Sequence, residues 1–262
     1  MIPQADILEW RSKVPWKTVE QVEQDLIICR ALTELFSQEL LSEHLAFRGG
    51  TALHKLHLAP PMRYSEDIDL VQIKPGPNKP IMDAVRQALD KFMGKPRWDI
   101  KERGTTMFYR VQSETPPTAR LRLKVEINTR EHFAVLGIEK HPFAVASRWF
   151  TGKCSVPTYP LDELLGTKLR ALYQRNKGRD LFDMWHGITF GKAQPAVIVD
   201  TFRKYMKADD HTVSQKEFRK NLALKLKNAK FLGDTADLLH ASVAYDQQHA
   251  YDFVDQEVLA LL

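Results

Sequence analysis

Two aspartates separated by a single residue, Asp67 and Asp69, are the side chains of this sequence best suited to chemistry. They lie in the stretch Ser-Glu-Asp-Ile-Asp-Leu, which reads as part of a β-strand. Side chains alternate along a strand, so both carboxylates should share one face, while Ile68 and Leu70 point into the core. A solvated strand face would explain an isolated Asp-x-Asp. Like charges this close repel unless a cation neutralises them, and hard oxygen ligands predict a Mg²⁺ site, with Mn²⁺ as the alternative ion.

A glycine pair, Gly49 and Gly50, precedes the aspartates and is followed by Thr51. Apolar residues predict a strand over 45–47 and a helix over 51–58, so the glycines form the turn between them. Glycine lets the backbone approach a ligand closely, and a helix N-terminus attracts phosphate. An ordinary turn with Thr51 as its cap would explain the triplet alone. Together with the aspartates it predicts a nucleotide site, to which Ser65 contributes from the same strand face.

A third carboxylate, Glu126, lies in a stretch with clean β-alternation over 121–128. If this strand neighbours the strand of the aspartates, Glu126 joins them and can orient or deprotonate an acceptor group. Arg122 and Lys124 would then add positive charge for phosphate. A half-exposed strand of mixed charge is the alternative interpretation.

Charged residues gather again around Lys168, the first of a cationic run. A lysine ammonium is a compact charge that suits a polyphosphate, so Lys168 is predicted to contact the phosphates of a nucleotide. A basic helix end is the alternative. Asp180 and Asp183 share a helix face, where they could cap the helix, pair with Arg175 or Arg179, or hold Lys168 in position.

The elements that must position these residues fall into two parts. The first part carries predicted helices and strands in alternation, which indicates an α+β domain with a mixed sheet and flanking helices. Its predicted helices cover 18–43 and 79–93, and its predicted strands cover 64–73, 107–112 and 121–128, the last two joined through Thr115, Pro116 and Pro117. Beyond Pro157 only helical patterns follow, over 161–173, 180–187, 195–207, 214–227 and 235–262. We therefore expect a domain over 1–155 with an N-terminal helix, and an all-helical domain over 156–262 that contributes Lys168 and Asp183 to the site.

Composition limits the class of protein. The chain of 262 residues is 44% hydrophobic and 27% charged, which is typical of globular proteins. Its net charge of +5 permits a polyanionic partner such as RNA. The sequence has no apolar run near 18 residues and no secretory signal, so no membrane partner is expected. Two distant cysteines, Cys29 and Cys154, suit a reducing compartment and predict a cytoplasmic protein.

The segments 49–55 and 63–70 closely resemble the nucleotidyltransferase toxins of the AbiEii/MenT type, members of the DNA polymerase β-like nucleotidyltransferase superfamily. The segments 164–172 and 179–183 extend the resemblance into the helical half. It implies a nucleotidyltransferase fold and a transfer of nucleotides from a nucleoside triphosphate with release of pyrophosphate. It also implies Asp67 and Asp69 as metal ligands and Lys168 and Asp183 as active-site residues. Further candidates in the same segments are Lys55, Arg63, Arg179 and Asp180.

The resemblance further implies the toxin of a toxin–antitoxin pair, with a cognate antitoxin and an RNA acceptor, the 3′ end of tRNA. Basic residues of the helical half would fit an RNA groove or a solvated helix face. One alternative is an enzyme of the same fold that modifies a protein or small-molecule hydroxyl. Another is a non-catalytic module that binds nucleotide or RNA. A helical partner-binding protein with a coincidental Asp-x-Asp would show no effect of metal or nucleotide on its thermal stability.

Overall fold

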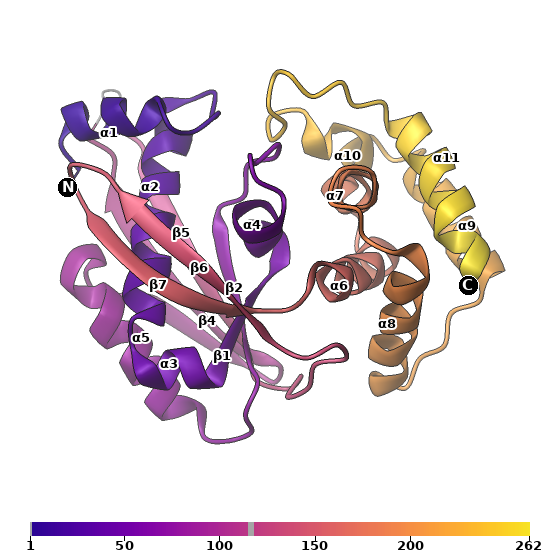
Figure 1. Cartoon of the computed structure of the whole chain (residues 1–262), viewed down its shortest axis with the longest axis horizontal. Helices are drawn as coiled ribbons and strands as arrows, with labels where there is room; N and C mark the ends of the chain where they lie inside the picture. Colours follow the sequence, from indigo (N-terminus) through magenta and orange to yellow (C-terminus); the bar gives the residue numbers. More distant parts are fainter. Residues whose placement is uncertain (1, 115–117) are drawn as a thin grey trace. The chain divides into compact units, whose positions relative to one another are not determined.

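The chain divides into two compact units, which interrupt one another in the sequence (Figure 1). A computed structural model describes residues 2–114 and 118–262, so the predicted connection through Thr115, Pro116 and Pro117 lies outside the described residues. The first unit contains Met1–Leu56 and Tyr64–Tyr159. The second unit contains His57–Arg63 and Pro160–Leu262, so it takes one short segment from within the first.

A seven-stranded mixed sheet forms the centre of the first unit, in the order β3-β4-β5-β2-β1-β7-β6. Strand β2 pairs antiparallel with β1 and parallel with β5, and β1 pairs parallel with β7. The strands are β1 Leu45–Arg48, β2 Asp67–Gln72, β3 Arg97–Lys101, β4 Gly104–Gln112, β5 Arg120–Asn128, β6 Glu139–Ala146 and β7 Thr151–Thr158. The sequence did not predict β3, β6 or β7. They lie at the two ends of the sheet, where many side chains are exposed and the apolar alternation is weak.

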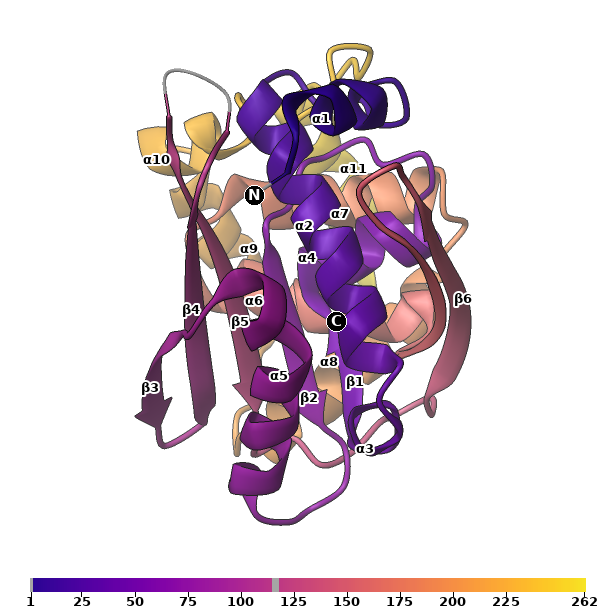
Figure 2. The ribbon, with the colours of Figure 1, turned by 90° about the vertical axis from the view of Figure 1, so that its left-hand side faces the viewer.

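Helices cover one face of this sheet, with α2 and α5 in front of the strands in Figure 2. The helices of this unit are α1 Gln4–Arg11, α2 Val19–Phe36, α3 Glu39–His44, α4 Gly49–Ala52 and α5 Asn78–Met93, and a π-helical turn Leu53–His57 follows α4. Thr18 caps α2, since its side chain accepts a hydrogen bond from the Gln21 N–H in a complete capping box. The helix predicted over 18–43 is instead two helices, because the backbone of Gln38 is extended.

The second unit is helical. Its helices are α6 Leu161–Gln174, α7 Gly178–Thr189, α8 Pro195–Ala208, α9 Gln215–Lys225, α10 Ala229–Leu232 and α11 Gln247–Glu257. Helix α6 packs against α7 and α8 through buried residues that include Leu165 and Leu169. The helix predicted over 235–262 begins only at Gln247. The backbone before it makes hydrogen bonds outside a helix, such as the bond from the His240 N–H to the Met62 carbonyl. Among the described residues, no helix is long and apolar enough to cross a membrane.

Candidate active site

The acidic pair of the first unit lies at the start of β2. Ile68 and Leu70 are buried, while Asp67 and Asp69 are only partly covered, so the predicted alternation of faces is confirmed. Strand β5 is the parallel neighbour of β2, and Glu126 lies in register with Asp69. The condition for a third carboxylate beside the pair is therefore met.

The glycine turn contacts the acidic pair directly. Helix α4 begins at Gly49, which has a φ of +80°, a left-handed conformation that side chains disfavour. A Cβ atom built at Gly49 would lie 2.1 Å from Asp69 Oδ2, so any other residue would collide with that carboxylate. The sequence separates these residues by a helix and a loop, yet the fold places the glycine backbone against Asp69.

Thr51 and Ser65 connect this turn to β2. The Thr51 hydroxyl donates to the backbone carbonyl of Asp67 over 2.6 Å, and the hydroxyl oxygens of Thr51 and Ser65 are 2.9 Å apart. These bonds fix the first turn of α4 relative to the strand. Five residues predicted to bind nucleotide or metal, namely Gly49, Thr51, Ser65, Asp67 and Asp69, therefore form one continuous group, and Gly50 adjoins it as a buried residue of α4.

Negative charge dominates this group. Burial and the neighbouring charge of Asp67 raise the pKa of Asp69 above its usual range. Lys124 Nζ lies 2.5 Å from Glu126 Oε2 and 3.8 Å from Asp67 Oδ2. The guanidinium of Arg48 forms an ion pair with Glu131 and also opposes the rise of the Asp69 pKa, but burial and Asp67 outweigh it. Among the described residues, Asp67, Asp69, Glu126 and Glu131 therefore outnumber the cations Arg48 and Lys124, and hard oxygen ligands with surplus negative charge fit a divalent cation such as Mg²⁺.

Lys55 is held in a separate contact within the first unit. Its Nζ lies 2.7 Å from Asp25 Oδ1 and 3.2 Å from Cys29 Sγ. Burial raises the pKa of the Cys29 thiol to about 12, so this cysteine is an unreactive thiol rather than a nucleophile. Both described partners of Lys55 lie on α2, so they anchor the π-helical turn to that helix.

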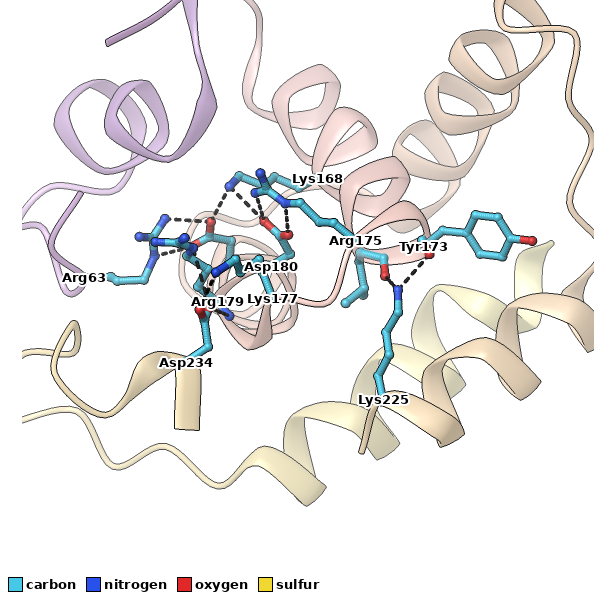
Figure 3. Close-up of polar contacts among 11 residues, drawn as sticks. Arg63, Lys168, Tyr173, Arg175, Lys177, Arg179, Asp180, Lys225 and Asp234 are labelled. Carbon is cyan, nitrogen blue, oxygen red and sulfur yellow. Dashed lines mark hydrogen bonds and ion pairs between the residues drawn. The ribbon is translucent and has the colours of Figure 1, made fainter. Parts of the chain in front are cut away.

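A second group of charges lies within the second unit (Figure 3). The guanidinium of Arg63 donates two hydrogen bonds to the carboxylate of Asp183, with lengths of 2.8 and 2.9 Å. Lys168 Nζ lies 2.9 Å from Asp183 Oδ2 and 3.1 Å from Asp180 Oδ1. Arg175 holds Asp180 with bonds of 2.6 and 2.7 Å. We call Lys168 and the four residues around it, Arg63, Arg175, Asp180 and Asp183, the lysine cradle.

Charges in the lysine cradle leave a positive surplus. Asp180 and Asp183 are both 0% exposed, and three cationic side chains face these two carboxylates. Burial alone would raise the pKa of Asp180, but Lys168 and Arg175 outweigh burial and hold it below its usual range. The two arginines balance the two carboxylates, so the charge of Lys168 is the surplus, and an anion would compensate it.

Two further cations of the second unit have other partners. The backbone N–H of Arg179 donates to Asp234 Oδ2 over 3.1 Å, and its guanidinium lies 3.5 Å from the same oxygen. Lys225 donates to the carbonyl oxygens of Leu172 and Tyr173, and burial lowers its pKa to about 8. The sequence patterns gave no indication of the position of Lys225, because a contact with a helix C-terminus depends on tertiary packing.

Two solved structures share this fold. One is a nucleotidyltransferase from H. pylori, which matches with a TM-score of 0.53 and 16% identity over 94% of this chain and 96% of that one. The other is MenT4, a nucleotidyltransferase toxin from Mycobacterium tuberculosis, with a TM-score of 0.52 and 16% identity over 100% of this chain and 99% of that one. No curated protein matches the sequence. Both likenesses show the fold of this chain, which is a nucleotidyltransferase fold.

A family model makes the assignment more specific. Residues 30–253 match the AbiEii nucleotidyl transferase toxins of type IV toxin–antitoxin systems. The match covers most of the chain and both units. This chain belongs to the AbiEii family, and it is a nucleotidyltransferase that uses a nucleoside triphosphate as substrate.

Proposed function

We propose that this chain is the toxin of a toxin–antitoxin pair, and that it transfers a nucleoside monophosphate from a nucleoside triphosphate to an RNA acceptor, the 3′ end of tRNA. Such a transfer would block translation, and a cognate antitoxin would restrain it. The proposal places the reaction in the cytoplasm, with Mg²⁺ as the cofactor. The observation that carries it is the surplus of carboxylates directly against the glycine turn.

In this proposal, the first unit binds the reacting phosphate. Asp67 and Asp69 would hold the divalent ion, which supplies charge neutralisation at the phosphoryl oxygens when bound. Backbone N–H groups at Gly49 and Gly50 and the hydroxyl of Ser65 bind the phosphates. Their positions are fixed by the bond between Thr51 and the Asp67 carbonyl, so little reorganisation is needed on binding.

The chemical step is an in-line substitution at the α-phosphorus. A hydroxyl oxygen of the acceptor forms a new bond to the α-phosphorus, and the bond from that phosphorus to the bridging oxygen breaks. Pyrophosphate leaves with the electron pair, and the hydroxyl proton passes to a base. Glu126 is the proposed base, because its carboxylate lies in register with Asp69 on the neighbouring strand and is 48% exposed.

Lys168 is the proposed cation that binds the phosphates of the leaving pyrophosphate. Asp183 and Asp180 hold its ammonium in place, and being 0% exposed they act as positioning residues.

The decisive test is nucleotide transfer in vitro. Purified full-length chain is incubated with each labelled nucleoside triphosphate, Mg²⁺ and total cellular RNA, beside the variants Asp69→Asn and Asp83→Asn. Asp83 is a matched control, because it is an exposed aspartate on α5. Label on a tRNA-sized band that is lost only in Asp69→Asn supports the proposal. Label on protein would identify a different acceptor, and binding without transfer would indicate a non-catalytic module.

A further inference from the structure

An open pocket of about 550 Å³ lies within the second unit, lined by the segment 57–62, the end of α7 and the irregular chain around Val243. This volume is typical of sites that bind small molecules. Apolar and aromatic groups dominate the lining, including Pro60, Met62, Trp185 and Phe190, and Ser242 is one of its few polar residues.

Aromatic rings give this pocket its chemistry. Phe190 is 61% exposed, yet its ring lies 5.7 Å from that of Trp185 and 4.9 Å from that of His186. Burial lowers the pKa of His186, so its imidazole is uncharged at neutral pH. Flat, uncharged rings of this kind bind nucleobases by stacking, which contributes about 1–3 kcal/mol per base.

The pocket adjoins the lysine cradle along two of the three segments that line it. Met62 of the pocket is the neighbour of Arg63 in the sequence. Asp183 precedes His186 by three residues on α7, so the two side chains share one side of the helix. Asp183 is also close enough to oppose the lowering of the His186 pKa. A flat aromatic surface therefore lies beside a cluster with surplus positive charge.

A ligand that satisfies both features has a flat aromatic end and a polyanionic end. We infer that the second unit holds the nucleoside triphosphate at both ends, with its base in the pocket beside Phe190 and its phosphates at Lys168. The identity of the ligand rests on the proposed function. Few polar groups line the pocket, so stacking provides most of the base affinity, and discrimination among the four bases is weak.

Binding measurements separate the two ends of the ligand. The full chain is titrated by calorimetry, without an acceptor, with a non-hydrolysable nucleoside triphosphate and with inorganic tripolyphosphate, which lacks the base. Phe190→Ala should weaken nucleotide binding about fivefold or more and leave tripolyphosphate binding unchanged. Leu224→Ala is the matched control, since Leu224 is also 61% exposed, on α9, and this variant should change neither affinity.

A second variant, Val243→Trp, fills the pocket from an irregular segment and should also reduce nucleotide binding alone. Equal losses for both probes would overturn the inference, as would no loss for either. Unchanged nucleotide binding with a raised KM for RNA would assign the pocket to the acceptor and also reject it. A chain that shows the expected binding pattern but transfers no label would retain this inference while rejecting the proposed function.

Discussion

Aspartate has opposite electrostatic surroundings in the two units. In the first unit, burial and Asp67 raise the pKa of Asp69, and carboxylates outnumber cations. In the second unit, Lys168 and Arg175 hold the pKa of Asp180 below its usual range despite complete burial. The same side chain therefore acquires different chemistry from its partners alone. The acidic group of the first unit has more carboxylates than cations, so it can bind a cation. The lysine cradle of the second unit has more cations than carboxylates, so it can bind an anion.

This contrast separates two roles for acidic residues. Asp67 and Asp69 are partly covered and lie beside a glycine backbone, so they can bind a ligand. Asp183 is fully buried, and Arg63 and Lys168 occupy both of its oxygens. Its proposed contribution to activity is therefore indirect, through the position of the Lys168 ammonium. Four predictions test or sharpen the comparison, and the largest effect comes first.

Removal of an arginine from the lysine cradle should cost stability according to its burial. Arg63 is 1% exposed, whereas the side chain of Arg175 is 51% exposed, and each pairs with one aspartate. Arg63→Ala leaves Asp183 buried beside one cation and should lower the free energy of unfolding by about 3–5 kcal/mol. Arg175→Ala also leaves Asp180 buried beside one cation, but water can enter the half-exposed position of the lost arginine, so the loss should be smaller, about 1–2 kcal/mol. Urea denaturation measures both, and similar losses would contradict the distinction.

Asp69→Asn should separate activity from stability. It removes a proposed metal ligand, so nucleotide transfer should fall about 10²–10³-fold. It also relieves repulsion with Asp67, so without metal the variant should melt at the same temperature as the wild type or higher. Thermal melts with Mg²⁺ and with EDTA check this, because only the wild type should gain stability from Mg²⁺. An equal gain in the variant would exclude Asp69 as a ligand.

Glu23 is a buried carboxylate outside both the acidic group of the first unit and the lysine cradle. It is 0% exposed, neither of its oxygens has a hydrogen-bond partner among the described residues, and burial raises its pKa to about 7. Between pH 4.5 and 7 the folded chain retains a proton that the unfolded chain releases, so rising pH lowers stability in this window.

We therefore expect Glu23→Gln to be about 1–3 kcal/mol more stable than the wild type above pH 7, and this advantage should vanish near pH 4.5. Urea denaturation across this range measures the difference. A constant difference at every pH would mean that the proton on Glu23 is not its cause.

Lys225 provides the smallest test, as a buried cation that donates hydrogen bonds to the carbonyl oxygens of Leu172 and Tyr173. Its pKa falls from 10.5 to about 8, so between these values the unfolded chain binds a proton that the folded chain has lost. Stability contributed by this residue should therefore rise as pH increases through that window. Relative to Lys225→Met, the wild type should gain about 1 kcal/mol from pH 8 to pH 10, measured by urea denaturation. A parallel pH dependence in both proteins would contradict this.

Local patterns predicted the parts of the site that lie close together in the sequence. The alternation around Ile68 and the glycine turn at Gly49 follow from strand and turn chemistry, and both are confirmed. The pairing of β5 with β2, which brings Glu126 into register, was stated only as a condition, because strand order depends on long-range contacts. Asp183 was predicted as an active-site residue, but its burial between Arg63 and Lys168 becomes visible only in the fold.

Other features were beyond the reach of sequence patterns. Trp185 is buried like its neighbour Phe182, yet its ring also lines a pocket. Exposure on one edge of a buried ring leaves no periodic signal. Strand β3 was missed because its residues are exposed throughout, so hydrophobic alternation could not reveal it.

The segment His57–Arg63 makes the helical unit discontinuous, and this has a consequence for dissection of the protein. A fragment that starts at Pro160 would contain Asp183 but lack Arg63, so it would bury a carboxylate without its principal partner. A fragment that ends at Tyr159 would carry the orphaned segment in solvent. Neither fragment therefore contains all the residues of its unit and no others. A split version of this enzyme would need residues 57–63 supplied to the C-terminal fragment, for example as a fused peptide.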